Sequence, residues 1–341
     1  MRILGIETSC DDTGVGIVTL KQGKIVIEAQ VTASQILTHR KYGGVVPEVA
    51  AREHALTILP TIAGALRQAK KTWAAIDAIA VTAGPGLNTA LVVGVEAART
   101  LSYSLKKPLV RVNHIEGHIL SAWASIAADD VRFPALALVV SGGHTELIHM
   151  TDIGRYTLLG RTQDDAVGEA FDKVAKILGL PYPGGPEVSR RAEHGNPRAF
   201  TFPRAMLEKH SLNFSYSGLK TSVLYTVEKL PRVTQQTINN VCASFQRAAL
   251  DPLLEKTYLA AKKINAKTIV LAGGVAANAL LRQDFLTMVE RRLSGVRFLV
   301  PDRAVCMDNG VMIAIAGAYR AQKKDFTPWQ KISADPNWEL V

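Results

Sequence analysis

His114 and His118 have the spacing of a metal-binding pair. Residues four positions apart lie on the same face of a helix, so both imidazoles can reach one ion; the alternative is one surface histidine and one core histidine. We expect Asp308, at the start of the last predicted helix, to be the third ligand, although a carboxylate there could instead cap the helix. The pair differs from the zinc-protease motif, in which glutamate directly follows the first histidine, because Ile115 occupies that position. The spacing therefore indicates a metal site and disfavours a metalloprotease.

Glycine-rich turns follow predicted strands at residues 8–14, 141–145 and 273–278. Glycine lets the backbone approach a ligand closely, hydroxyls donate to phosphate oxygens, and a helix N-terminus favours an anion. Any one of these turns alone would be ordinary, but together they predict a nucleotide site. Asn278 could contact the nucleotide or cap its helix, and capping is the commoner role. The sequence has no Gly-x-x-x-x-Gly-Lys-Ser/Thr motif, which argues against a P-loop ATPase.

Carboxylates lie within or near these turns. Asp165, Glu169 and Asp172 would share one face of a helix predicted to begin at the first of them. Like charges repel, so either water solvates them or they bind a cation, basic groups or hydroxyls, with ribose hydroxyls favoured for at least one. Asp11 and Asp12, in the first turn, could act as a base, steer a metal-bound phosphate or stabilise the turn.

The segment between residues 190 and 220 combines basic and aromatic side chains. The basic residues are Arg190, Arg191, Arg198, Arg204, Lys209 and Lys220, and the aromatic residues are Phe200, Phe202, Phe214 and Tyr216. Basic groups bind phosphates and exposed aromatic rings stack on unpaired bases, as an RNA loop requires. The alternative is an ordinary packed insertion with a solvated face.

The composition of the chain excludes several classes of protein. The net charge of +10 makes nucleic acid a plausible partner, although a basic soluble enzyme fits equally well. With 48% hydrophobic and 21% charged residues, the chain is globular, not disordered or collagen-like. Its three cysteines are far apart and imply no disulfide framework. Without a signal peptide or an apolar run of roughly 20 residues, we expect a cytoplasmic protein with no membrane partner.

The predicted elements occur in the same order twice, and this duplication must position the turns. Each half has three strands, a helix, a strand and a helix (βββαβα), followed by a further strand and helix. We expect the three strands at 3–7, 15–20 and 24–31, and their counterparts at 135–140, 145–150 and 156–159. Buried strands are expected at 78–82 and 268–272. The pattern predicts a duplicated α/β protein with two lobes.

We expect the N-terminal lobe at residues 1–132 and the C-terminal lobe at 133–308, with a helix at about 309–325 packing back on the first lobe. The second lobe carries an insertion at about 179–229. Within it, the proline- and glycine-rich run of residues 181–186 predicts irregular structure. Rigid loops of this composition are typical of binding or docking surfaces.

Motifs along nearly the whole chain resemble those of the TsaD family of tRNA threonylcarbamoyladenosine enzymes, once described as glycoproteases. They are Ile3 to Asp11, Tyr42 to Glu48, Thr82 to Leu87, the His114 and His118 pair, Val139 to Thr145, Gly168 to Lys173, Tyr182 to Pro186, Phe214 to Thr221, Ala272 to Asn278, and Asp308 to Gly310. The resemblance implies an actin-like (ASKHA) fold of the hexokinase and Hsp70 type, used by an acyltransferase.

The resemblance also implies a reaction in tRNA processing. The family transfers the threonylcarbamoyl group from threonylcarbamoyl-AMP to the exocyclic amine of adenosine 37, in tRNAs that read ANN codons, forming threonylcarbamoyladenosine (t6A). Bacterial members work with an inactive actin-like paralogue and a small P-loop ATPase, while a separate synthase supplies the adenylate. Helices predicted at about 48–70 and 88–105 could form the paralogue interface or simply face the core.

Site residues follow from the matching motifs. One divalent metal, Fe²⁺ first and Zn²⁺ as the alternative, would bind His114, His118 and Asp308. The residues expected to hold the adenylate are Val139, Val140, Ser141, Gly142, Gly143, Asp172, Gly185 and Asn278, with Asp172 on the ribose hydroxyls. Asp11 or Asp12 would assist proton removal. The family commonly has Asp-Glu where this chain has Asp11-Asp12, which shortens the second side chain by one carbon.

Other classes of protein would behave differently. A small-molecule kinase of the same fold would turn over ATP without tRNA. A metalloprotease would show proteolysis that a chelator abolishes. A non-catalytic scaffold would bind nucleotide and do nothing more, so only the transferase requires tRNA.

Overall fold

The computed structural model describes residues 1–126, 131–204 and 211–341, and the chain divides into two compact units. The first unit combines Met1–Val131 with Pro301–Val341, and the second is Arg132–Val300. The first unit is thus built from both ends of the sequence and the second from one continuous segment. No helix among the described residues is long and apolar enough to cross a membrane.

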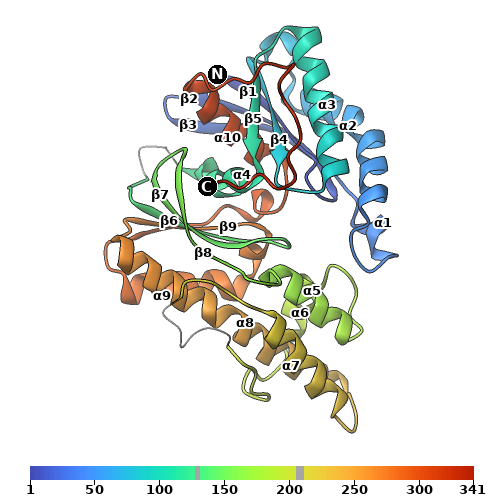
Figure 1. Ribbon diagram of the computed structural model, residues 1–341, viewed down its shortest axis with the longest axis vertical. Coiled ribbons are helices and arrows are strands. Elements are labelled where there is room, and N and C mark those ends of the chain that lie inside the picture. The colour runs from blue at the N-terminus through green and yellow to red at the C-terminus, as the bar shows by residue number, and fades with distance from the viewer. Residues whose placement is uncertain (127–130, 205–210) are drawn as a thin grey trace. The chain divides into compact units, whose positions relative to one another are not determined.

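The first unit contains a mixed five-stranded sheet in the order β3-β2-β1-β4-β5. β1 pairs antiparallel with β2 and parallel with β4. The helices α2 and α3 lie on one face of this sheet and α10 on the other (Figure 1). The elements are β1 (Arg2–Glu7), β2 (Asp12–Lys21), β3 (Lys24–Ser34), α1 (Ile36–Arg40), α2 (Pro47–Ala69), η1 (Trp73–Ala75), β4 (Ala78–Gly84), α3 (Asn88–Leu105), β5 (Leu109–Asn113), α4 (His114–Ser121), η2 (Ala122–Ser125), η5 (Arg303–Val305) and α10 (Gly310–Gln322).

The second unit repeats this topology with a sheet in the order β10-β9-β6-β7-β8. β6 pairs antiparallel with β7 and parallel with β9, as β1 does with β2 and β4. The elements are β6 (Ala135–Val140), β7 (Thr145–Asp152), β8 (Arg155–Arg161), α5 (Val167–Ile177), α6 (Gly184–Ala192), α7 (Ser217–Glu228), α8 (Gln235–Ile264), β9 (Thr268–Ala272), η4 (Gly274–Ala277), α9 (Ala279–Arg292) and β10 (Arg297–Leu299). The predicted duplication is therefore confirmed.

The strand β1 shows why α10 belongs to the first unit. Successive side chains of a strand point to opposite faces, so Leu4 and Ile6 enter the core beneath α2 and α3 while Gly5 faces α10. A Cβ atom on Gly5 would lie 2.3 Å from the backbone nitrogen of Ala314 and 2.4 Å from the carbonyl oxygen of Gly310. Only glycine permits this approach, so α10 packs directly on the backbone of the sheet.

Several boundaries differ from the sequence prediction. β2 begins at Asp12, within the stretch expected to be a turn, because Asp12 pairs with Ser34 of β3. α6 begins at Gly184, so half of the run expected to be irregular is helical. Its first turn tolerates Pro186 because the first backbone N–H groups of a helix need no partner within it. The 30-residue helix α8 has no counterpart in the predicted elements.

Candidate functional site

The helix α4 begins at His114 because the residue before it caps the helix. The side-chain oxygen of Asn113 accepts hydrogen bonds from the backbone N–H groups of Ile115 (2.9 Å) and Glu116 (3.4 Å). The amide of Asn113 donates to the carbonyl oxygen of Trp338 (3.0 Å), which ties the cap to the C-terminal segment. β5 ends at Asn113 and α4 begins at His114, so the cap and the contact with Trp338 together fix where His114 lies.

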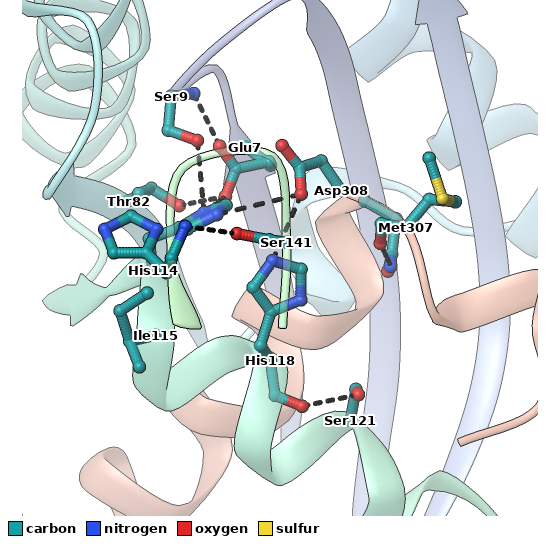
Figure 2. A network of polar contacts seen from close by, with 12 residues as sticks. Glu7, Ser9, Thr82, His114, Ile115, His118, Ser121, Ser141, Met307 and Asp308 are labelled. Atoms are coloured by element: carbon teal, nitrogen blue, oxygen red, sulfur yellow. Dashed lines mark hydrogen bonds and ion pairs between the residues drawn. The ribbon is translucent and has the colours of Figure 1, made fainter. Parts of the chain in front are cut away.

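The first unit brings the three predicted metal ligands together (Figure 2). One ligand atom from each of His114, His118 and Asp308 lies within 4.8 Å of the others. Asp308 Oδ1 is 3.2 Å from Nε2 of His118 and 3.7 Å from Nε2 of His114. Two imidazole nitrogens and one carboxylate oxygen therefore converge on a single point.

The environment of His118 fits a bound cation. Its side chain is fully buried, and neither ring nitrogen has a hydrogen-bond partner among the described residues. Nε2 faces Asp308 Oδ1 at 3.2 Å, but a buried imidazole that makes no hydrogen bond is costly, and coordination to a metal would remove that cost. Asp308 does not act as a helix cap, because the side chain of Asn309 caps α10 by accepting from the N–H of Met312 (2.9 Å). The capping role that was the alternative for Asp308 therefore belongs to Asn309.

Glu7 lies beside this cluster and was not identified from the sequence. Burial raises the pKa of its carboxyl, but His114 and the hydrogen bond from Ser9 together lower it by more, so the pKa lies below its usual value. Burial lowers the pKa of His114, yet the carboxylates of Glu7 and Asp308 raise it to about 9. The two carboxylates therefore favour a positive charge at His114. The signal in the sequence was a single carboxylate at the end of the otherwise apolar run Ile3 to Ile6.

Asp11 and Asp12 lie close enough to Asp308 to be influenced by its charge. Burial raises the pKa of Asp11, and Asp308 raises it further. Burial also raises the pKa of Asp12, to about 7; a hydrogen bond from the Ser34 hydroxyl opposes this rise, and Asp11, Asp308 and Glu7 add to it. A carboxyl with a pKa near neutrality can exchange a proton at physiological pH.

The second unit gathers the residues predicted to hold the adenylate. Val139 and Val140, at the end of β6, are fully buried, so only their backbone atoms can meet a ligand. Gly142 and Gly143 follow in an exposed turn, and a Cβ atom on either would contact nothing within 4 Å. Ser141 closes the turn through its hydroxyl, which accepts from the N–H of His144 (3.1 Å). The turn therefore presents open backbone.

The helix α6 links the remaining residues of this set. Asp172 Oδ1 accepts from the N–H of Gly184 (2.7 Å) at the start of α6. One turn on, the hydroxyl of Ser189 donates to the carbonyl of Gly185 (2.9 Å) and accepts from the amide of Asn278 (2.9 Å). The Oδ1 atom of Asn278 accepts from the N–H of Leu281, so this residue caps α9.

The carboxylates of α5 do not form the expected stack. The helix begins at Val167, so Asp165 precedes it and cannot share a helical face with Glu169 and Asp172. Instead, Asp165 binds Nζ of Lys173 (2.7 Å) and of Lys220 (3.2 Å), and Glu169 binds Nζ of Lys173 (2.8 Å). Basic groups therefore pair with Asp165 and Glu169, and Asp172 contacts the start of α6.

The aromatic residues of the insertion are mostly core. Phe202, Phe214 and Tyr216 are buried, and the hydroxyl of Tyr216 donates to the carbonyl of Ala249 (3.2 Å). Buried rings cannot stack on RNA bases, so for these residues the packed-insertion interpretation is the correct one. Arg190 pairs with Glu187, Arg204 pairs with Asp251, and Lys209 lies outside the described residues.

Solved structures confirm the fold class. T.kodakarensis HypF aligns with a TM-score of 0.63 at 15% identity, covering 95% of this chain and 48% of that chain. A ROK hexokinase from Thermus thermophilus aligns with a TM-score of 0.52 at 16% identity, covering 95% of this chain and 100% of that chain. Likeness at these identities shows the fold alone, which is the expected ASKHA fold.

Sequence comparison identifies the family. The family model described as "TsaD: tRNA N6-adenosine threonylcarbamoyltransferase" matches residues 26–315. A tRNA N6-adenosine threonylcarbamoyltransferase from Desulfitobacterium hafniense (strain Y51) is 48% identical over 343 residues, covering 100% of this chain and 98% of the relative. The enzyme of the same description from Bacillus subtilis (strain 168) is 49% identical over 324 residues, covering 95% and 91%. The chain that carries this His-His-Asp cluster therefore belongs to the TsaD family of tRNA N6-adenosine threonylcarbamoyltransferases.

Proposed function

We propose that this chain transfers the threonylcarbamoyl group from threonylcarbamoyl-AMP to the exocyclic amine of adenosine 37, in tRNAs that read ANN codons, and so forms t6A. The observation that carries the proposal is the convergence of His114, His118 and Asp308 within a chain that the family model matches over residues 26–315. The net charge of +10 suits a polyanionic substrate such as tRNA.

The donor set supports iron as the bound metal, with zinc as the alternative. Two histidines and one carboxylate are the protein ligands of many non-haem Fe²⁺ sites, which keep other coordination positions for substrate. Zn²⁺ binds the same types of donor. A metal held by His114, His118 and Asp308 would supply Lewis-acid chemistry, orienting and polarising oxygens of the acyl group.

The second unit supports adenylate binding through open backbone. A Cβ atom on Gly142, Gly143 or Gly185 would meet nothing within 4 Å, which leaves space for a phosphate beside the backbone. Backbone amides held in such a turn stabilise negative charge. The carboxylate of Asp172, held at the start of α6, is suited to accept hydrogen bonds from ribose hydroxyls.

The reaction itself needs alignment and a good leaving group. The lone pair of the exocyclic amine is delocalised into the adenine ring, so the amine is a weak nucleophile and must be aligned with the carbamoyl carbon. The new C–N bond forms as the bond from that carbon to the AMP oxygen breaks, and AMP leaves with the bonding electrons. Amides of the turn at Gly142 and Gly143 would stabilise the charge that grows on the phosphate.

A base must also take the proton that the amine loses. Asp12 suits this role better than Asp11, because burial and neighbouring carboxylates raise its pKa to about 7. Its side chain is one carbon shorter than the glutamate common in the family, but the start of β2 at Asp12 holds it in the sheet.

The protein partners carried by the resemblance are an inactive actin-like paralogue, a small P-loop ATPase and a separate synthase that makes the adenylate. Exposed apolar side chains on the first unit support a protein interface: Leu56 and Leu59 of α2 are 71% and 66% exposed, and Tyr103 of α3 is 63% exposed. The tRNA substrate supports the expected cytoplasmic location.

Nucleoside mass spectrometry tests the reaction directly. Unmodified tRNA is incubated with the purified chain, its metal, the partner proteins and pre-made threonylcarbamoyl-AMP, and is then digested to nucleosides. We expect t6A with the wild type and none with the His114→Ala/His118→Ala variant. Absence of t6A with the wild type and a verified set of partners would contradict the transferase. ATP turnover without tRNA would favour a kinase, and chelator-sensitive proteolysis a protease.

A further inference from the structure

Glu7 is a fully buried carboxylate at the end of β1. Its Oε1 atom accepts a hydrogen bond from the N–H of Ser9 (2.5 Å), and its Oε2 atom accepts one from the hydroxyl of Thr82 (2.6 Å). Donors from β4 and from the turn after β1 therefore hold the carboxylate in one orientation. A carboxylate is costly to bury, and these contacts leave its position little freedom.

The same carboxylate contacts one of the two histidines of the cluster. Oε2 of Glu7 lies 3.0 Å from Nδ1 of His114, and the hydroxyl of Ser9 lies 3.1 Å from that nitrogen (Figure 2). A carboxylate can only accept, so this contact requires a proton on Nδ1 of the imidazole. In the neutral ring, the lone pair then lies on Nε2, which is the nitrogen directed at Asp308.

We propose that Glu7 is a positioning residue for the metal ligand His114: it holds the Nδ1-protonated tautomer and the ring plane that present Nε2 to the ion. A carboxylate behind a ligating histidine fixes the tautomer and makes the ligand more basic. The inference rests on the metal role proposed for His114. Nδ1 of His118 has no hydrogen-bond partner among the described residues, so the carboxylate supports one histidine of the pair and not the other.

The substitution Glu7→Gln tests the tautomer. If the glutamine amide nitrogen occupied the Oε1 position, two N–H donors would face each other, because the backbone N–H of Ser9 cannot rotate away. We therefore expect the amide nitrogen at the Oε2 position, beside Nδ1 of His114. There it donates to Nδ1, which moves the ring proton to Nε2 and blocks the coordinating lone pair. We expect the dissociation constants of Co²⁺ and Zn²⁺, measured on metal-free protein, to rise about 10- to 100-fold. The visible absorption spectrum of the Co²⁺ complex should also change, because the coordination by His114 is altered.

Glu116 provides a matched control on the same helix. Its carboxylate is 1% exposed and pairs with Arg320 (2.7 Å). We expect Glu116→Gln and Glu7→Gln both to lower the thermal midpoint, because each loses a buried carboxylate contact, but Glu116→Gln should leave the dissociation constants of both metals unchanged. Equal loss of metal affinity in the two variants would overturn the proposal, because the role of Glu7 would then be structural.

A measurement on the wild type does not depend on the folding of any variant. Long-range ¹H–¹⁵N spectra of the Zn²⁺-loaded chain, labelled at histidine, report which ring nitrogen carries the proton. We expect His114 to be protonated at Nδ1 and bound through Nε2; binding through Nδ1 would overturn the proposal. If the wild type and Glu7→Gln bind metal equally well, the positioning role fails and the metal site stands. If the wild type binds no metal, both fail.

Discussion

Three carboxylates of the first unit, those of Asp308, Glu7 and Asp12, differ in their contacts and in their surroundings. Asp308 converges on the histidines, Glu7 contacts the far side of one of them, and Asp12 has a pKa raised to about 7 by burial and by its acidic neighbours. The roles proposed for these three carboxylates, as a ligand, a support and a base, therefore differ with burial and with the nearest charge.

The substitution Asp12→Asn tests the base. In single-turnover assays with pre-made threonylcarbamoyl-AMP, the wild-type rate should fall as the pH drops below about 7, because the carboxylate must be ionised to accept a proton. The variant should lose this dependence and react about 100- to 10,000-fold more slowly. A variant that keeps both the rate and the acidic fall in rate would assign the base to another group.

Ser34→Ala is the companion variant for the same pH profile. The hydrogen bond from Ser34 lowers the pKa of Asp12, so its removal should move the fall in rate to higher pH without abolishing it. The pH profile of the single-turnover rate checks this shift. A shift to lower pH, or none, would show that Asp12 does not control the profile.

At the scale of elements, two helices depend on caps supplied by their neighbours. α4 is capped by Asn113, the last residue of β5. The N-terminus of α7 has no cap of its own at Tyr216, and Asp164, from the loop before α5, accepts from the backbone N–H groups of Tyr216 (2.7 Å) and Ser217 (3.3 Å). Each cap therefore fixes the position of a helix relative to another element.

Removing the cap of α4 should lower the stability of the protein. Asn113→Ala is expected to reduce the free energy of unfolding by about 1 kcal/mol, as loss of an N-cap usually does. Asn113→Asp keeps a capping oxygen and loses only the amide that donates to Trp338, so it should recover most of the difference. Urea unfolding of the three proteins measures this. Equal losses in both variants would locate the stabilisation in the contact with Trp338.

Asp164 should make the free energy of unfolding depend on pH in the acidic range. Burial raises its pKa, but hydrogen bonds from Ser215, Tyr216 and Ser217 outweigh burial, so the folded pKa lies below the usual value of 3.8. Such a group stabilises the fold above its unfolded pKa, and the contribution disappears as the pH falls through the folded pKa. Because the carboxylate is exposed, we expect Asp164→Asn to cost only about 1 kcal/mol at pH 7.

Urea unfolding between pH 3 and pH 7 checks the sign of this effect. The wild type should lose more stability than Asp164→Asn as the pH falls below about 4, so the two curves should converge in acid. Curves that stay parallel would show that the carboxylate of Asp164 contributes no charge-dependent stability.

At the scale of the whole molecule, the two sheets share a strand order but are assembled from the chain differently. The second unit is continuous from Arg132 to Val300, whereas the first closes only when Pro301–Val341 joins Met1–Val131. α10 covers the face of the first sheet where Gly5, Gly14 and Gly16 admit its backbone. The last segment of the chain therefore completes the fold of the first.

This assembly predicts how fragments behave. A fragment of residues 132–300 should fold alone and unfold cooperatively in urea, because its sheet and covering helices are local. A fragment of residues 1–131 should not, because the face of its sheet under α10 would be exposed to water. Circular dichroism and the dispersion of amide NMR signals measure both. Native-like spectra for the shorter fragment would contradict the role assigned to α10.

The sequence by itself determined the repeated order of strands and helices and several of their bounds. The strands expected at 135–140 and 268–272 are β6 (Ala135–Val140) and β9 (Thr268–Ala272). Hydrophobic runs and turn residues are local patterns in the sequence, so they can be recognised without knowledge of the fold. The spacing of His114 and His118 is local in the same way, and Asp308 was predicted from its place at the start of the last helix, in agreement with the family motifs.

Only the tertiary structure decided which distant groups meet. It placed Glu7 behind His114, which follows it by 107 positions, and paired Asp165 with Lys220 instead of stacking it on α5. It also buried Phe214 and Tyr216, which composition alone allowed to be exposed. These outcomes depend on how segments remote in the chain pack and on which charges they bury together. No local pattern encodes that packing, because each partner acquires its role only when the other is in place.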